Sequence, residues 1–184
     1  MATYYFDTNA LIKLYVFDAT SYWTIGIESQ RRPQNRIIVS EIVRVEIPSA
    51  LYKIGRIDPI VDPSMIDLGM RRFRRQLSAD TSYRKSRFLV ATLNEAVFQQ
   101  AETLLEKYRL GMPKALHSLD ALHLASAIVA RNALSAGARA DLYFVSADKQ
   151  LRGCAHSEGF TVLDPIDSKL SGLSIGGCRA LVAV

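Results

Sequence analysis

The stretch Tyr4-Tyr5-Phe6-Asp7-Thr8-Asn9 decides how the rest of the chain is interpreted, because an apolar, aromatic run stops abruptly at a carboxylate. Residues 2–6 are typical of a short buried strand, and residues 10–16 of the apolar start of a helix. Open α/β sheets place their ligands at the carboxyl ends of strands, so Asp7 is the first candidate for chemistry. The alternative is structural: Asp7, Thr8 or Asn9 caps the following helix by accepting hydrogen bonds from its first N–H groups.

The composition bounds the class of protein. With 184 residues, 49% of them hydrophobic, the chain is long enough for one domain with a sizeable core. Its apolar runs are all shorter than the roughly 20 residues needed to span a bilayer, and the first residues lack the pattern of a secretory signal. Cys154 and Cys178 are too few for a disulfide framework and lack metal-ligand spacing. We therefore expect one cytoplasmic domain without a membrane segment.

The charge is positive and unevenly distributed. A net charge of +5 and a pI near 9.3 favour a polyanionic partner. Most of the excess lies in the middle of the chain, at Arg71, Arg72, Arg74 and Arg75 and then at Arg84, Lys85 and Arg87. Two interpretations stay open for the first cluster: contact with RNA phosphates, or a solvated helix face that an acidic partner protein covers.

Strands and helices alternate along the chain. Further strands are expected at 36–40, 142–145 and 160–163, whereas residues 88–90 are too few to distinguish strand from helix. Helices are expected at 10–16, 22–27, 41–54, 65–77, 93–110, from 118 onwards and at 149–156. Pro48 should bend the helix over 41–54 and Gly55 should end it, and residues 58–67 are read as a connection. This alternation predicts an α/β fold of three layers, α/β/α, with a mostly parallel sheet of about four to five strands.

Glu46 lies on a stripe of small and apolar residues that should face the sheet. Its helical neighbours are Ile42, Val43, Ser49 and Ala50. A carboxylate in such a place costs several kcal/mol unless a basic group or a cation compensates for it. The structural alternatives are a salt bridge to an Arg, or a position at the margin of the stripe with the carboxylate in water.

Two more acids stand at expected helix starts. Asp120 lies in the first turn of the helix from 118, where the helix dipole favours an acid whether or not it has another role. Asp148 follows the strand at 142–145 and should lie on the same edge of a parallel sheet as Asp7. His123 is either a core histidine or a hydrogen-bond partner of the acidic site. The sequence favours a core histidine, because nothing else resembles a histidine metal motif.

Convergence of Asp7, Glu46, Asp120 and Asp148 is the functional hypothesis. Carboxylates brought together raise one another's pKa values unless a cation neutralises them. Ligation by oxygen alone suits Mg²⁺ or Mn²⁺, and such ions activate water for attack on a phosphodiester. The short polar side chains beside the acids are well placed to orient the water, the carboxylates or a phosphate; they are Thr8, Asn9, Ser40 and Ser146.

Four motifs together resemble the PIN domain, most closely the VapC-like toxins of bacterial and archaeal toxin–antitoxin pairs. They are Phe6-Asp7-Thr8-Asn9-Ala10-Leu11, Val39-Ser40 followed by Glu46, Leu119-Asp120-Ala121-Leu122-His123-Leu124-Ala125, and Val145-Ser146-Ala147-Asp148. Each motif alone is weak, but their order and spacing are specific, and the resemblance covers roughly residues 2–165. We therefore expect a PIN-like nuclease domain over 1–167 and an extension of unknown role over 168–184.

The resemblance implies a Mg²⁺- or Mn²⁺-dependent endoribonuclease whose acidic quartet is Asp7, Glu46, Asp120 and Asp148, with Asn9 where Ser, Thr or Asn usually stands. It also implies an RNA substrate, homodimerisation, and inhibition by a small antitoxin protein. One alternative is a PIN-like module that binds RNA or protein without cutting. A phosphatase of the haloacid dehalogenase type is disfavoured, because its second Asp, two residues after the first, is replaced here by Asn9.

Overall fold

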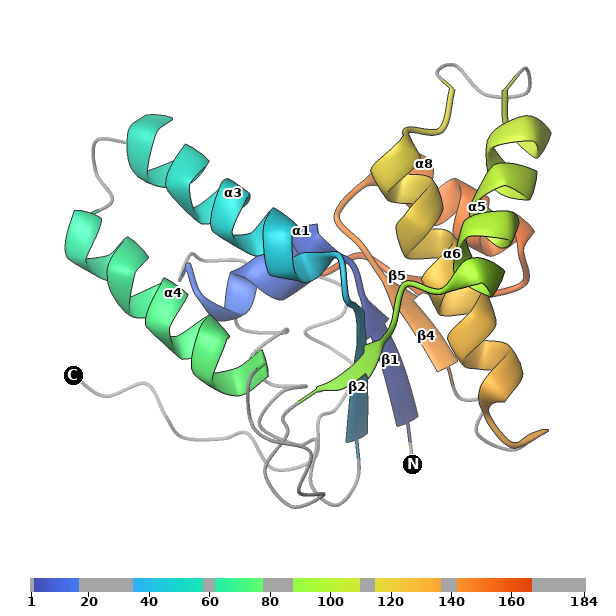
Figure 1. Ribbon diagram of the computed structural model, residues 1–184, viewed down its shortest axis with the longest axis horizontal. Helices are drawn as coiled ribbons and strands as arrows, with labels where there is room; N and C mark the ends of the chain where they lie inside the picture. The colour runs from blue at the N-terminus through green and yellow to red at the C-terminus, as the bar shows by residue number, and fades with distance from the viewer. Residues whose placement is uncertain are drawn as a thin grey trace.

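The fold is built on one parallel sheet of five strands. The computed structural model describes residues 2–16, 35–57, 62–77, 88–109, 115–136 and 142–166. The strands are β1 (Ala2–Phe6), β2 (Asn35–Ser40), β3 (Leu89–Ala91), β4 (Leu142–Val145) and β5 (Thr161–Leu163). They lie in the order β3-β2-β1-β4-β5 and every neighbouring pair is parallel (Figure 1). The strand expected at 36–40 and the parallel sheet are confirmed, and the ambiguous residues 88–90 contribute to strand β3.

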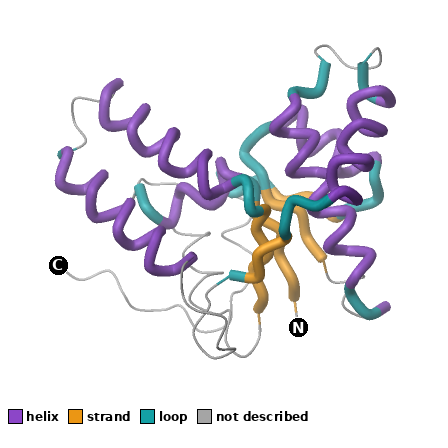
Figure 2. Tube along the Cα trace, viewed as in Figure 1, coloured by secondary structure: helices purple, strands orange, loops and turns teal. Residues whose placement is uncertain are grey.

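Alternating side chains of the strands supply two hydrophobic cores, one on each face of the sheet. Tyr5 and Phe144 belong to one core, and Phe6 and Val145 to the other. The first core is covered by α5 (Glu95–Lys107), α6 (Ser118–Ala133) and α8 (Lys149–Ser157). The second is covered by α1 (Thr8–Leu11), the 3₁₀ helix η1 (Ile12–Leu14), α3 (Val43–Ile57) and α4 (Pro63–Leu77). Figure 2 shows the strands between these two helical layers, so the predicted three-layer α/β/α architecture is confirmed.

The strand order reverses at β1, because the chain leaves β1 for β2 on one side and later returns to β4 on the other. Phe6 is in register with Val39 of β2 and with Val145 of β4. The residues that follow these three, namely Asp7, Ser40 and Ser146, therefore come out together at the carboxyl edge of the sheet. In open α/β sheets this edge, beside the strand where the order reverses, is where ligands bind.

Two expected helix boundaries are wrong in the layer that contains α3 and α4. Gly55 does not end α3, which continues to Ile57. A Cβ atom at Gly55 would lie 3.1 Å from Ile66 Cγ1 of α4, so the glycine lets the two helices approach closely. Residues 58–67 are not all connection, because α4 already begins at Pro63. Proline suits the first position of a helix, where its missing N–H would have had no partner, and Asp62 accepts a hydrogen bond from the Ser64 N–H at 2.8 Å.

Other boundaries move by a few residues for local reasons. The first helix begins at Thr8 rather than residue 10, because Asp7 caps it, and it continues as η1. The helix expected over 93–110 is shorter, because Asn94 caps α5 by accepting from the Val97 N–H. The helix expected at 22–27, the basic residues at 84–87 and the extension at 168–184 lie outside the described residues. Among the described helices, none is both long enough and apolar enough to cross a membrane.

Candidate metal and nuclease site

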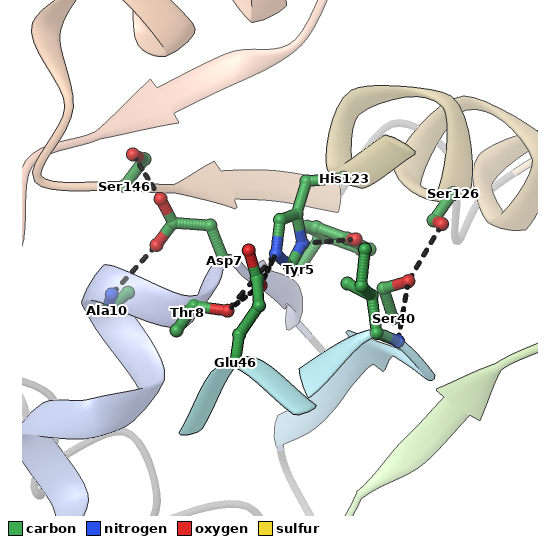
Figure 3. A network of polar contacts seen from close by, with 10 residues as sticks. Tyr5, Asp7, Thr8, Ala10, Ser40, Glu46, His123, Ser126 and Ser146 are labelled. Atoms are coloured by element: carbon green, nitrogen blue, oxygen red, sulfur yellow. Dashed lines mark hydrogen bonds and ion pairs between the residues drawn. The ribbon is translucent and has the colours of Figure 1, made fainter. Parts of the chain in front are cut away.

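Asp7 serves as a helix cap and is also the most buried acid of the candidate site. Its Oδ1 accepts a hydrogen bond from the Ala10 N–H at 2.7 Å, and its Oδ2 accepts one from the Ser146 hydroxyl at 2.5 Å (Figure 3). Only 2% of Asp7 is exposed. Burial raises its pKa to about 6, against the opposing effects of His123, Ser146 and the Ala10 N–H. The capping role that the sequence offered as an alternative is therefore real, and it coexists with a strongly perturbed carboxyl group.

Ser146 connects Asp7 to the start of α8. The Ser146 hydroxyl donates to Asp7 and accepts the Asp148 N–H at 2.9 Å, while Asp148 Oδ1 caps α8 by accepting the Leu151 N–H at 2.8 Å. Arg152 supports the same loop, because it donates to the Ser146 carbonyl at 2.6 Å and pairs with Asp164 at 2.7 Å. Asp148 is thus held near Asp7 by a rigid turn, as the two strand-end positions predict.

Asp120 completes a group of three interacting carboxylates. It lies in the first turn of α6, half-buried. Burial, and then the charge of Asp148, raise its pKa, and its own charge in turn raises the pKa of Asp7. Within the described residues, no Lys or Arg forms an ion pair with any of the three. The cluster formed by Asp7, Asp120 and Asp148, which we call the aspartate cluster, therefore carries negative charge that no ion pair within the described residues balances. The charge of His123 lowers the pKa of Asp7 and, with His117, that of Asp120, but burial outweighs it.

Glu46 has a basic partner, which is His123 rather than the Arg that the sequence offered. Glu46 Oε2 lies 2.6 Å from His123 Nε2 and also accepts a short hydrogen bond from the Thr8 hydroxyl. Burial raises the pKa of Glu46, but the hydrogen bond and charge of His123, together with Thr8, outweigh it and hold this pKa below its ordinary value. His123 is buried, as expected of a core histidine, yet it is also the partner of the acidic site, the alternative that the sequence favoured less.

The short polar residues proposed to orient water separate into different environments. Thr8 and Ser146 bind carboxylates, and Asn9 is exposed. Ser40 does not contact an acid: it is fully buried, and its hydroxyl lies 3.0 Å from that of Ser126 and 3.4 Å from the Ile42 N–H. The side chain of Ser40 points into the interface between β2 and α6, because the position after Val39 faces the first core.

The arginine cluster lies on α4, where Arg71, Arg74 and Arg75 are exposed. Arg74 and Arg44 line one cavity of about 360 Å³ with Pro48, Phe73 and Leu77. The carboxyl end of α4 therefore lies beside the amino end of α3, the end that carries Glu46. This places Arg74 at the edge of the helical layer nearest to the acids.

Sequence reasoning missed Tyr5, Ser126 and Arg152. The Tyr5 hydroxyl lies 3.1 Å from His123 Nδ1, on the side of the ring opposite Glu46. The signal available for Tyr5 and Ser126 was a hydroxyl inside an otherwise apolar strand or helix, which demands a buried partner. Nothing in the sequence marks the contact between Arg152 and Ser146.

The side chains fit a hard divalent cation by their chemistry. Asp7, Asp120 and Asp148 offer only oxygen ligands. The raised pKa values of Asp7 and Asp120, and the lack of a Lys or Arg ion pair with the cluster among the described residues, indicate a place where a bound cation would relieve repulsion. Within the described ranges, however, no three His, Cys, Asp or Glu side chains form a closed group that would hold a metal ion. The donor set is therefore suitable, and the carboxylates would have to close around an ion on binding.

Comparison with known proteins agrees with this architecture. No curated protein matches the chain significantly. Among solved structures, VapBC2 from Rickettsia felis, bound to a DNA fragment from its promoter, matches with a TM-score of 0.53 and 14% identity over 88% of this chain and 98% of the other. FitAB bound to an IR36 DNA fragment matches with a TM-score of 0.55 and 12% identity over 89% and 96%. At such identities the likeness concerns the fold. The PIN domain profile matches residues 4–156, which is most of the chain, and the protein belongs to the PIN domain family.

Proposed function

We propose that this protein is a metal-dependent endoribonuclease and the toxin of a type II toxin–antitoxin pair. The observation that carries the proposal is the aspartate cluster: three carboxylates at the carboxyl edge of a PIN domain sheet, one of them buried, without a Lys or Arg counterion among the described residues. Proteins retain such an arrangement against its electrostatic cost where a cation and an anionic substrate are handled.

In this proposal Asp7, Asp120 and Asp148 hold Mg²⁺ or Mn²⁺, and Glu46 acts as a ligand directly or through water. The bound ion would supply an activated water and neutralise charge on the phosphate. The protein's own contribution is orientation. Ser146 and the Ala10 N–H fix Asp7, Asp148 is fixed by its capping bond, and Thr8 and His123 fix Glu46. Asn9, exposed beside Asp7, is available to a phosphate or a base.

The exposed face of α3 and α4 supports a protein partner. Val45, Tyr52, Met65 and Leu68 are large apolar side chains with about half or more of their area exposed. Exposed apolar side chains indicate an interaction surface where they share one face, and Val45 and Tyr52, seven residues apart on α3, do so. The two similar structures are complexes bound to DNA, which is the arrangement expected of a toxin with a DNA-binding antitoxin. We propose an antitoxin as the partner, together with a homodimer of this chain, and a cytoplasmic location.

The test is cleavage of a mixed pool of structured RNAs by purified protein with Mg²⁺, with Mn²⁺ and with chelator. The expected result is metal-dependent cutting that is lost in Asp7→Asn, a change that preserves the shape of the side chain and its capping bond. Asp67 is exposed near the amino end of α4, away from the end that lies beside Glu46, so Asp67→Asn is a matched control that removes one carboxylate and should cut normally. Cleavage by Asp7→Asn at the wild-type rate would contradict the assignment of the site.

A second candidate function is a PIN-like module that binds RNA or protein without cutting. One observation favours it: the acids do not form a closed metal-binding group in the described part of the chain. Calorimetric titration of Mn²⁺ into wild type and Asp7→Asn separates the two functions. Binding that Asp7→Asn weakens supports the nuclease, whereas no binding to either protein supports the module.

A further inference from the structure

A hydrogen-bonded series of buried and half-buried polar side chains runs from the acidic site into the first core of the sheet. It begins at Glu46 on α3, passes through His123 on α6 and ends at Tyr5 on β1 (Figure 3). His123 is 2% exposed and follows Asp120 by one helical turn, so both side chains lie on the same face of α6. This hydrogen-bonded series therefore connects α3 and α6, which cover opposite faces of the sheet, at the carboxyl edge of the strands.

The protons in this chain can be assigned from the donors and acceptors. Glu46 has a lowered pKa and accepts only, so His123 Nε2 must carry the hydrogen of the 2.6 Å contact. Burial raises the pKa of Tyr5 well above its ordinary value, so Tyr5 keeps its O–H. The contact between the Tyr5 hydroxyl and Nδ1 lies on the opposite side of the ring from Glu46. Tyr5 thereby fixes the ring in the orientation in which Nε2 points at Glu46.

Both described contacts of Glu46 fall on the same oxygen. His123 and Thr8 each bind Oε2, and Oε1 has no hydrogen-bond partner among the described residues. The carboxylate is thus anchored at one oxygen while the other stays available, and it is close enough to Asp120 to raise the pKa of that residue. A glutamate held only by its backbone would move among several rotamers and would present Oε1 in one direction for only part of the time.

The partners of His123 argue against a purely structural role. The residues beside it on α6 are apolar and buried, namely Ala121, Leu124 and Ala125. A histidine that merely filled this core would need only local backbone partners for its nitrogens. Instead, Nδ1 contacts Tyr5 of β1, and Nε2 contacts both Thr8 of α1 and Glu46 of α3, an acid of the candidate site.

We propose that His123, oriented by the Tyr5 hydroxyl, is a positioning residue that fixes the Glu46 carboxylate with Oε2 held and Oε1 available to the acidic site. The consequences for catalysis and metal binding rest on the proposed nuclease function. The hydrogen-bond arrangement itself does not rest on that function, so the nuclease function and the positioning of Glu46 can be tested separately.

Four variants test the proposal in the full chain. His123→Leu keeps a similar volume and removes the polar contacts with Tyr5, Glu46 and Thr8, whereas His123→Gln restores an amide N–H near the position of Nε2. Tyr5→Phe removes only the hydroxyl that orients the ring. Tyr143→Phe is the matched control: Tyr143 lies on the neighbouring strand β4 and stacks on Tyr4, which belongs to the second core, away from His123.

Steady-state cleavage of one RNA oligonucleotide and calorimetric binding of Mn²⁺ are the functional measurements. Loss of a residue that orients a ligand costs about 10- to 100-fold, so His123→Leu should lower kcat and Mn²⁺ affinity by about this factor with little change in KM. His123→Gln should recover most of both losses, Tyr5→Phe should lie between, and Tyr143→Phe should match wild type. Wild-type kcat in His123→Leu, or no recovery in His123→Gln, would overturn the proposal.

Nitrogen-15 NMR of the histidine rings provides a measurement that needs neither RNA nor metal. The chain has three histidines, and His123→Gln identifies the signals of His123 by their absence. Nε2 of the wild-type ring should carry a hydrogen, and Tyr5→Phe should shift the ring signals because the hydroxyl that contacts Nδ1 is lost. A wild-type ring whose only hydrogen lies on Nδ1 would overturn the proposal even if RNA is cut. If the wild type does not cut RNA and yet shows the Nε2–H ring, the nuclease function fails and the positioning of Glu46 stands.

Discussion

The aspartate cluster and the pair formed by Glu46 and His123 are neighbours at one sheet edge with opposite electrostatic character. Burial raises the pKa of Asp7 to about 6, and burial with the charge of Asp148 raises that of Asp120. Glu46 is also partly buried, yet its pKa is lowered because His123 and Thr8 outweigh the burial. The protein therefore gives one acid a directly hydrogen-bonded basic partner, whereas none of the other three forms an ion pair with a described residue. This difference suggests where a cation would be bound, and it can be tested in three ways.

The largest expected effect is on metal affinity. Asp148→Asn removes charge from the part of the site without a basic partner and should weaken Mn²⁺ binding by more than about 100-fold, above the 10- to 100-fold range for an outer-shell residue. Glu46→Gln removes charge that His123 already balances, so its effect should stay within about 10- to 100-fold, the range also expected for His123→Leu. Isothermal titration of both variants under the same buffer measures the comparison. Equal losses would mean that the partner of Glu46 does not distinguish it from the aspartate cluster in metal binding.

The second effect concerns stability in the presence of chelator. The pKa of Asp7 is raised from 3.8 to about 6 in the folded protein, so the folded state binds this proton more tightly than the unfolded state. The free energy of unfolding should then fall as the pH rises from about 4 to about 6, by roughly 3 kcal/mol at about 1.4 kcal/mol per pKa unit. Asp7→Asn should remove this loss, so that it is more stable than wild type at pH 8 by up to about that amount and similar at pH 4.

Urea denaturation of wild type and Asp7→Asn at both pH values measures this effect. Glu46→Gln is the matched control with the opposite sign: the pKa of Glu46 is lowered in the folded state, so its charge stabilises above the unfolded pKa and that gain is lost as the pH falls. Glu46→Gln should therefore be less stable than wild type at pH 8. A wild type that is more stable than Asp7→Asn at pH 8 in chelator would show that Asp7 has a counter-group that the described residues do not reveal.

The contrast between the two parts of the site also marks what the sequence could predict. Asp7 and Asp148 were predictable because each follows an apolar strand, and the parallel sheet brings strand ends to one edge. The caps at Asp7 and Asp148 are likewise local, since each binds an N–H three residues on. Information within a few residues along the chain was enough to place these acids.

The pairing of Glu46 with His123 was not predictable, because it joins residues 77 positions apart on helices from opposite faces of the sheet. Helical periodicity shows that each side chain faces inwards, but it does not show that two inward faces meet around the sheet edge. The prediction that Gly55 ends α3 was wrong for a related reason. A glycine that ends a helix and a glycine that lets a neighbouring helix approach look the same in sequence, and only the contact with Ile66 distinguishes them. The strand-end position of Ser40 predicted a side chain beside the acids, but its hydroxyl contacts Ser126 in the first core.

The smallest expected effect concerns the arginines of α4, which extend the comparison from the acids to the surface beside them. If Arg71 and Arg74 contact RNA phosphates, each neutralised arginine should reduce the slope of log affinity against log salt by about 0.7, the value per contact for single-stranded nucleic acid. The test is RNA binding by Arg71→Gln/Arg74→Gln in the Asp7→Asn background, which prevents cleavage, over a range of salt concentrations.

Arg56→Gln is the matched control, because Arg56 is exposed near the far end of α3, about 15 Å from Glu46 along the helix at about 1.5 Å per residue. An unchanged slope in the double variant would assign these arginines to solvent or to an acidic antitoxin surface. A reduced slope in the double variant alone would extend the site from the aspartate cluster onto α4, so that the acids and the exposed Arg71 and Arg74 serve the same phosphate backbone.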